Sequence, residues 1–300
     1  MVQLMQWFWR PEYWLPPGIT WEDLKETEDI RYPQPRHLLL CFPITLLLIT
    51  IRFIFERKIA FPLSKKLGLK EKVRREPFPN QILEDFYTKW RKSPQKKPWF
   101  WNVSECLDGY PQQSAQLSLL GFYLMQFSLY WSLLITMPLD NKQKDFYMMI
   151  AHHVGAIVLI GFSYCVNFIR IGSVTMVLHD VTNWLLYAAK LFNYLKWEKT
   201  CNTVFIIFGL VFLLSHVIAF PYMVLHNTYY YLPKLHQPYF GYYFFNALLI
   251  VEYLLNVLWF CFIIIMVYRL LLLGKVEKDV RSDSEGSEEE DVDEVDQKAE

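Results

Sequence analysis

The chain has 300 residues, of which 53% are hydrophobic and 18% aromatic, and its formal net charge is zero. So high a proportion of apolar and aromatic residues argues against an ordinary soluble domain and indicates an integral membrane protein. The zero net charge conceals a basic stretch, residues 55–100 with thirteen Lys or Arg, and an acidic one, residues 276–300 with twelve Asp or Glu.

Residues 1–36 hold four tryptophans among several prolines and lack the unbroken apolar core of a cleavable signal peptide. We expect an interfacial segment, because aromatic residues next to a span favour the membrane surface. Residues 37–55 are long and apolar enough for a first transmembrane helix. Residues 56–114 form a basic linker, which the positive-inside rule places in the cytoplasm, with the N-terminus on the other side. The positive-inside rule is sufficient to explain the many basic residues of this linker. We therefore expect no nucleic-acid partner.

Five further apolar runs follow, which makes six predicted spans and an all-α, polytopic helical bundle. An even number of spans would place both termini on one side, and residues 56–114 would stay on one side between the first two spans. Residues 274–300 are too charged and too poor in apolar residues to fold, so we expect a disordered acidic tail. The five further runs are residues 115–137, 147–168, 172–192, 203–225 and 242–273.

Polar side chains inside two of these runs mark a candidate catalytic site, because ionisable groups within a bilayer are costly and are usually functional. A histidine beside a carboxylate can act as a base or as a nucleophile near neutral pH. No metal is expected, since neither the histidines nor the five cysteines show metal-ligand spacing. The candidate catalytic residues are His152, His153, His179, Asp180 and Asn183.

The helical rise predicts which of these groups lie at one depth. In a straight antiparallel pair that turns near residues 168–170, His152 and His153 lie roughly 25 Å from the turn, whereas His179 and Asp180 lie roughly 15 Å from it. On that measure Asn183 is level with the histidine pair, on one stripe with Asp180, Tyr187 and Lys190. A lone histidine, His216, is expected to hydrogen-bond a neighbouring helix. Glu252 and Asn256, one turn apart in the last run, either line the cavity or pair structurally.

The stretch from residue 152 to residue 194 resembles the signature region of the ceramide synthases, within the wider TLC-domain family. The matching motifs are His152-His153, Phe162-Ser163-Tyr164, Asn167-x-x-Arg170-x-Gly172, His179-Asp180 and Ala189-Lys190-x-Phe192.

The resemblance implies a TLC-like catalytic domain over residues 115–273 in a multi-pass protein of the endoplasmic reticulum membrane. It also implies transfer of a fatty acyl group from acyl-CoA, as co-substrate and without a resident cofactor, to the amine of sphinganine or sphingosine. His152 or His153 would be the nucleophile or base, Asp180 would orient it, and His179 and Asn183 would support it. Lys142 and Lys144 either attract the phosphates of coenzyme A or are ordinary interfacial lysines.

The chain departs from the ceramide synthase pattern in three ways. It lacks the homeobox-like region and one span, and it carries Asn183 and Tyr187 where the family usually has acids. An asparagine can orient a histidine but cannot balance an imidazolium charge, so these substitutions predict slow or absent activity. Two other functions therefore stay open: an inactive relative that dimerises with active synthases and regulates them, and a lipid-binding or transport protein. Homo- or heterodimers with ceramide synthases are the expected protein partners, and membrane lipids the expected surroundings.

Two kinds of modification site are also predicted. Ser282 and Ser287 in the acidic tail each have an acid three residues on, which an acidophilic kinase favours, and the tail resembles a phosphorylated motif of the ceramide synthases. Asn102 begins an Asn-Val-Ser sequon, which is usable for glycosylation only on the luminal side.

Overall fold

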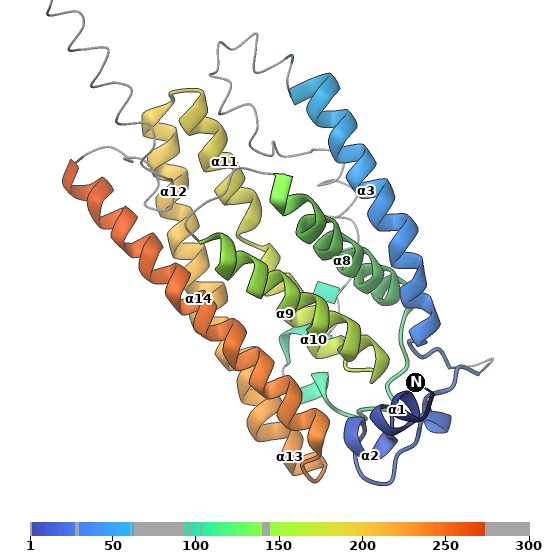
Figure 1. Cartoon of the computed structure of the whole chain (residues 1–300). Coiled ribbons are helices and arrows are strands. Elements are labelled where there is room, and N and C mark those ends of the chain that lie inside the picture. Colours follow the sequence, from blue (N-terminus) through green and yellow to red (C-terminus); the bar gives the residue numbers. More distant parts are fainter. Residues whose placement is uncertain are drawn as a thin grey trace, which may run out of the picture.

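The computed structural model describes residues 2–27, 30–60, 62, 94–95, 98–102, 104–139 and 145–273. Within these ranges the regular structure is entirely helical (Figure 1), as predicted. The predicted acidic tail and most of the basic linker lie outside the described residues.

The N-terminal segment contains the short helices α1 (Val2–Phe8) and α2 (Pro11–Trp14), packed against one end of the bundle. The Trp14 side chain is buried, and its ring centroid lies 4.9 Å from that of Phe162 and 5.2 Å from that of Phe244. These aromatic contacts tie the segment to the two helices that carry Phe162 and Phe244.

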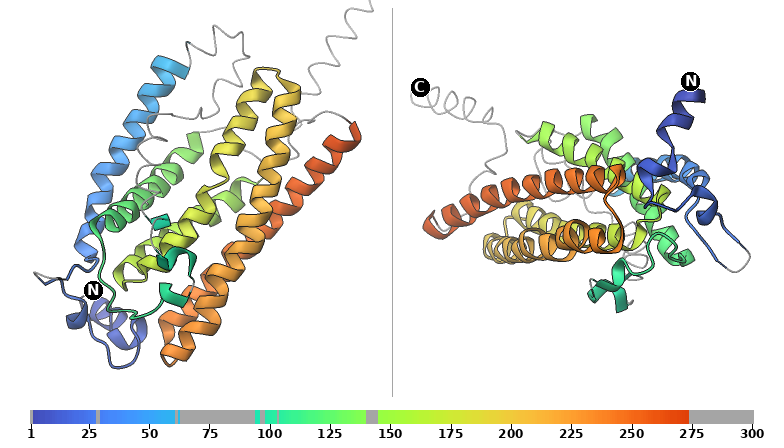
Figure 2. Two further views of the ribbon diagram at one scale, coloured as in Figure 1. Left: turned by 180° about the vertical axis from the view of Figure 1, so that it is seen from behind. Right: turned by 90° about the horizontal axis from the view of Figure 1, so that it is seen from below.

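The remaining helices form a bundle of long, roughly aligned elements (Figures 1 and 2). The membrane stretch that begins with α12 continues through π-helical segments, in which Pro221 cannot donate a backbone hydrogen bond. The helices are α3 (Cys41–Phe55), α7 (Pro98–Trp101), α8 (Leu117–Thr136), α9 (Phe146–Cys165), α10 (Ile169–Asp180), α11 (Asn183–Tyr194), α12 (Glu198–Phe212), π segments Leu213–Ala219, Pro221–Leu225 and Asn227–Tyr231, α13 (Leu232–Leu235) and α14 (Phe240–Leu273).

Five helical stretches among the described residues are long and apolar enough to cross a membrane: Pro35–Lys58, Leu117–Leu139, Phe146–Cys165, Glu198–Leu235 and Phe240–Leu272. They correspond to five of the six predicted spans.

The sixth prediction, one continuous helix over residues 172–192, is wrong. The chain forms α10 and α11 there, with a break at Val181 and Thr182. Asp180, Thr182 and Asn183 cluster at this break, and such side chains offer the backbone alternatives to helical hydrogen bonds. The two short helices together still run along the bundle, as seen from behind in Figure 2.

Helices α3 and α8 pack side by side and run in the same direction. The Arg31 carbonyl accepts a hydrogen bond from Ala115 N (2.8 Å), Thr45 Oγ1 donates to the Ser128 carbonyl (3.1 Å), and Arg52 bonds Thr136 further along. These pairs advance together along both helices, so the end of α3 and the start of α8 lie at opposite ends of the bundle (Figure 1). The described ends of the linker, residues 56–60 and 104–114, therefore do not share a side, contrary to the expectation.

The two described ends of the chain also lie at opposite ends of the bundle. The first residues of α14 pack on the N-terminal segment, with ring centroids of Trp14 and Phe240 5.5 Å apart, and α14 then runs to the other end (Figure 1). The expectation that both termini share a side is thus wrong for the described ends. Counting apolar runs predicts the membrane side of each chain end only if every crossing of the membrane is an apolar run. Here the parallel packing of α3 on α8 shows that the two ends lie on opposite sides.

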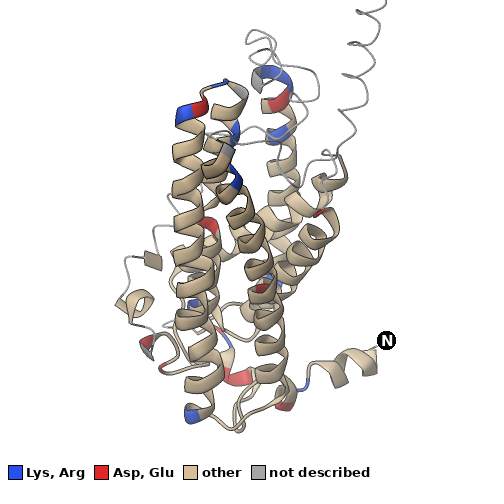
Figure 3. Cartoon of the chain, turned by 90° about the vertical axis from the view of Figure 1, so that its left-hand side faces the viewer, with Lys and Arg blue, Asp and Glu red and all other residues tan. Residues whose placement is uncertain are grey.

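Basic residues gather at the end of the bundle far from the N-terminus (Figure 3). Arg57 and Lys58 lie at the end of α3, and Lys196 and Lys199 at the turn from α11 to α12. The positive-inside rule favours this basic end as the cytoplasmic side. The N-terminal segment and Asn102 then lie on the opposite side.

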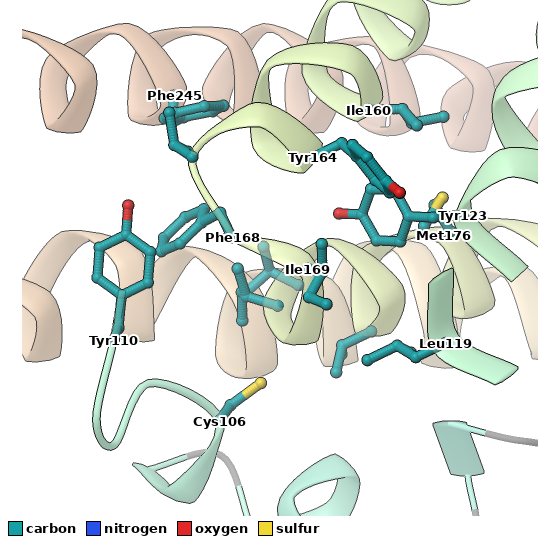
Figure 4. Packing of buried hydrophobic residues seen from close by; sticks show 14 of the residues in the cluster. Cys106, Tyr110, Leu119, Tyr123, Ile160, Tyr164, Phe168, Ile169, Met176 and Phe245 are labelled. Carbon is teal, nitrogen blue, oxygen red and sulfur yellow. The ribbon is translucent and has the colours of Figure 1, made fainter. Parts of the chain in front are cut away.

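The main core surrounds the turn between α9 and α10 (Figure 4). Asn167 lies in the turn after α9 with a left-handed backbone (φ 58°), and its side-chain amide donates to the carbonyls of Pro111 (2.5 Å) and Gln113 (2.8 Å). Asparagine tolerates this conformation better than most residues. Phe168 then packs on Tyr110, with ring centroids 4.8 Å apart. These contacts fix the direction in which α10 leaves the turn.

Candidate active site

A largely apolar cavity lies between α8, α9, α10 and α14. It holds about 570 Å³ of empty space, measured out to its open side. Its polar groups come from all four helices, and aliphatic and aromatic side chains form the rest of its walls. The lining residues are Tyr123, Tyr130, His152, Ala156, Leu159, Ile160, Ser163, Phe168, Ile171, Gly172, Thr175, Met176, His179, Phe245, Leu249 and Glu252.

His152 of α9 meets Glu252 of α14 at this cavity. The imidazole Nδ1 lies 2.5 Å from Glu252 Oε2, and the two side chains are 13% and 5% exposed. An ionised carboxylate only accepts hydrogen bonds, so Nδ1 carries the proton in this pair. In the neutral imidazole the second nitrogen, Nε2, then keeps its lone pair, and it makes no hydrogen bond with the described residues.

His179 of α10 is held at both ring nitrogens. Its Nδ1 lies 2.9 Å from the Thr175 carbonyl, and its Nε2 lies 3.1 Å from the amide Nδ2 of Asn256. A carbonyl requires a donor and an amide NH₂ requires an acceptor, which makes His179 a neutral imidazole protonated at Nδ1. Its ring stacks on that of His152, with centroids 5.9 Å apart. His179 therefore supports His152 and has no nitrogen left for chemistry.

His216 lies behind His179 in the first π-helical segment. The two ring centroids are 5.0 Å apart, and the His216 ring stacks on Phe212 at 4.1 Å. Its Nδ1 is hydrogen-bonded to the hydroxyl of Ser215 in its own segment (2.7 Å). The His216 imidazole also hydrogen-bonds the backbone of His179 in α10, so the hydrogen bond expected to a neighbouring helix is present. The three imidazoles of His152, His179 and His216 form a row.

Three other predicted residues lie elsewhere. His153 is buried, does not line the cavity, and packs on Tyr130 with ring centroids 5.7 Å apart. Asp180 is buried and accepts a hydrogen bond from the Gln126 amide, so the carboxylate on His152 is that of Glu252 and not that of Asp180. Asn183, the first residue of α11, is exposed and does not line the cavity.

The prediction that His179 lies at a different depth from His152 is wrong, because the turn is longer than we assumed. The helical part of α9 ends at Cys165 and that of α10 begins at Ile169. His152 and His179 then lie about 20 and 15 Å from their helix ends, a difference that two side chains can span. The break after Asp180 ends the stripe that would have carried Asn183 to the same depth.

The other predicted sites are less informative. Lys142, Lys144, Ser282 and Ser287 lie outside the described residues. Asn102 is exposed, and its side-chain amide donates to Glu105 Oε1 at 2.6 Å.

The sequence reasoning missed two residues, Gln126 and Tyr130 of α8, which contact Asp180 and His153. Gln126 carries the only side-chain amide within α8. An amide in so apolar a helix is the sequence feature that could have indicated a polar partner. Glu252 and Asn256, for which two roles were open, both contact a histidine of the site. Across the described residues, no group of three or more His, Cys, Asp or Glu side chains is arranged to hold a metal ion.

Fold and site together define a polytopic helical membrane protein with a histidine–carboxylate pair in an apolar cavity. The family model described as TLC domain matches residues 87–265. Ceramide synthase 4 of Mus musculus is 35% identical over 341 aligned positions, covering 94% of this chain and 87% of the relative. Ceramide synthase 3 of Homo sapiens is 34% identical, over 93% and 88%. The chain belongs to the TLC-domain family, and within it to the ceramide synthases.

This membership makes the chain a ceramide synthase-like N-acyltransferase. The alignment also shows that the chain is shorter than ceramide synthase 4 over the aligned region. Because 94% of 300 residues is 282, about sixty of the 341 aligned positions with ceramide synthase 4 have no counterpart here. A more distant relative, ASC1-like protein 3 of Oryza sativa, is 34% identical over 65% of this chain.

Proposed function

We propose that this chain transfers a fatty acyl group from acyl-CoA to the amine of sphinganine or sphingosine. The observation that carries this proposal is His152, which lines an apolar cavity with Nδ1 bound to Glu252 and Nε2 available. The names of the related ceramide synthases supply the product class. The reaction is expected to need acyl-CoA as co-substrate and no resident cofactor.

Two routes use His152 Nε2, and both give an amide and free coenzyme A thiol. As a nucleophile, Nε2 attacks the thioester carbonyl and the C–S bond breaks to release the thiolate. The sphingoid amine then attacks the acyl group and displaces the imidazole, and the proton that the amine loses goes to the thiolate. As a base, Nε2 takes the proton from the attacking amine while the C–N bond forms, and passes it to the departing thiolate. In both routes Glu252 holds the Nδ1 proton and stabilises positive charge on the ring.

The walls of the cavity fit a hydrocarbon chain. Leu159, Ile160, Ile171, Met176 and Leu249 line it, and burying an acyl chain against such side chains gains roughly 0.8 kcal/mol per CH₂ group. Aliphatic walls also exclude water, which would otherwise hydrolyse the thioester or an acyl-histidine. We therefore assign the fatty acyl group to this cavity.

The orientation of the bundle supports access by acyl-CoA from the cytoplasmic side of the endoplasmic reticulum membrane. His152 follows the first residue of α9, Phe146, by about 9 Å of helical rise. α9 runs from that end towards the N-terminal segment, where Phe162 packs on Trp14, so its first residues face the basic end of the bundle (Figure 1). Lys142 and Lys144 precede it in the sequence and are proposed to attract the phosphates of coenzyme A.

Acylation of sphinganine in membranes from cells without endogenous ceramide synthases tests this function. We expect product from the natural chain and a loss of roughly 10²-fold or more in His152→Ala, since a general base or nucleophile contributes at least that much. Asn183→Asp should act like the natural chain, because residue 183 is exposed and outside the cavity.

A silent natural chain with an active Asn183→Asp variant would overturn this proposal in favour of a regulatory relative. Co-expression with an active synthase, followed by co-purification and assay of the pair, would then measure that regulation. Equal activity in the natural chain and in His152→Ala would reject His152 as the reacting group.

A further inference from the structure

We propose that Glu252 is the positioning residue of His152 and that Gly155 provides the space its carboxylate needs. This inference rests on the proposed acyl transfer, and it adds a residue of the last helix that neither the family motifs nor the comparisons assign.

Both oxygens of Glu252 are placed against one face of α9. Oε2 lies 2.5 Å from His152 Nδ1, and a Cβ built at Gly155 would lie 2.5 Å from Oε1. Real side chains do not come this close, so any residue larger than glycine at 155 would displace the carboxylate. His152 and Gly155 are three positions apart and therefore share a helical face. Together they form the surface on which the Glu252 carboxylate lies, with a hydrogen bond at His152 and free space at Gly155.

The surroundings make this pairing necessary for Glu252. Its side chain is only 5% exposed, in a helix long and apolar enough to cross the membrane. A buried carboxylate is costly unless it is paired and hydrogen-bonded. No Lys or Arg lines the cavity, and its other polar lining residues are His152, His179, Tyr123, Tyr130, Ser163 and Thr175. The His152 imidazole is the group within hydrogen-bonding distance of the carboxylate.

The same pairing determines what His152 can do. A carboxylate at Nδ1 fixes the tautomer with its lone pair on Nε2, and it balances the charge that forms on the ring during transfer. His179 stacks on the other side of His152 but has both nitrogens engaged. Asp180 is bonded to Gln126 and Asn183 is exposed, so Glu252 is the acid placed to act on His152.

Enzyme kinetics test the positioning role. Glu252→Gln keeps the shape but removes the charge, and we expect kcat to fall roughly 10²-fold while KM for acyl-CoA changes less than about twofold. Gly155→Ala should lower kcat in the natural background but add nothing in a Glu252→Ala background, where no carboxylate is displaced. Gly161→Ala is the matched control on the same helix, since its Cβ would meet only the Phe127 ring at 3.3 Å.

Thermal unfolding of the purified full chain tests the pair without relying on activity. His152→Ala leaves a buried carboxylate unpaired and should lower Tm by several degrees, and the added change Glu252→Gln should restore part of this loss. Additive Tm changes, or Glu252→Gln with natural kcat, would overturn the proposal. An inactive natural chain that still shows the coupled Tm changes would reject the acyl-transfer function and leave the pairing intact.

Discussion

Gly172 is the position at which we expect the smallest substitution to have the largest structural effect. A Cβ built there would overlap the hydroxyl oxygen of Tyr123 and lie 2.9 Å from its Cζ atom. Tyr123 is 1% exposed, and its hydroxyl is hydrogen-bonded to Ser163 Oγ at 2.9 Å. Gly172→Ala must therefore push a buried ring aside and break this bond. Figure 4 shows Tyr123 packed beside Tyr164, which restricts where the ring can go.

The expected loss follows from these two effects. Overpacking a core costs about 1–3 kcal/mol, and a hydrogen bond contributes about 1 kcal/mol, so Gly172→Ala should destabilise the chain by roughly 2–4 kcal/mol. Tyr123→Phe alone should cost about 1 kcal/mol through the lost bond to Ser163. In the Tyr123→Phe background, Gly172→Ala should cost less, because the hydroxyl is gone and only the ring carbon remains in the way.

Unfolding of the purified protein in detergent, followed by heat or by denaturant, measures all four forms of this cycle. Gly161→Ala serves as the control for adding a methyl group to a helical glycine. The reasoning is refuted if Gly172→Ala is as stable as the natural chain, or if it costs the same with tyrosine and with phenylalanine at 123. The first result would mean that the turn between α9 and α10 adjusts freely, and the second that the hydroxyl is not the obstacle.

Two further predictions concern the end of the bundle that carries the N-terminal segment. Asn102 should be glycosylated in cells, since it is exposed and directly follows α7, whose Trp99 ring centroid lies 5.9 Å from Arg170 at the start of α10, away from the basic end. A glycosidase-sensitive mobility shift should vanish in Asn102→Gln, and no shift in the natural chain would contradict this prediction. Cys106 is 1% exposed, and burial raises the pKa of its thiol to about 12. Because the thiolate is the reactive form, maleimide at pH 7–8 should label Cys106 only after denaturation. Labelling of the folded chain at Cys106 would refute this.

The positions of the long helices could be predicted from the sequence because composition alone determines them. Residues 115–137 were expected to form a span, and α8 covers Leu117–Thr136. The run over residues 172–192 is nearly as long, with 13 apolar residues of 21 against 16 of 23, yet it is broken at Val181 and Thr182. An apolar run shows that a segment enters the bilayer, but it does not show that one helix crosses it. The polar residues at the break, Asp180 and Asn183, are evident in the sequence. They were interpreted only as catalytic residues and not also as a signal for a helix break.

The histidines of the site could be predicted, but their partners could not. Periodicity shows which residues of one helix share a face, as for His152 and Gly155. It does not show which residue of another helix meets that face. Glu252 lies 100 positions from His152, and only the packing of α14 against α9 brings the two together at 2.5 Å. The depth calculated from the helical rise put Asn183 level with His152. That calculation treated residues 172–192 as one straight helix, whereas the chain bends after Asp180.

This difference changes the meaning of the uncharged residue at 183. From the sequence, asparagine there predicts an imidazolium without a counter-charge and hence a slow or inactive protein. In the structure residue 183 is exposed at the start of α11, and the charge beside His152 comes from Glu252 of α14. A carboxylate can approach an imidazole from any helix that packs on it, and the interaction depends on distance and burial, not on position in a motif. Loss of a motif acid therefore implies loss of activity only where no other helix supplies a carboxylate, and here α14 supplies one.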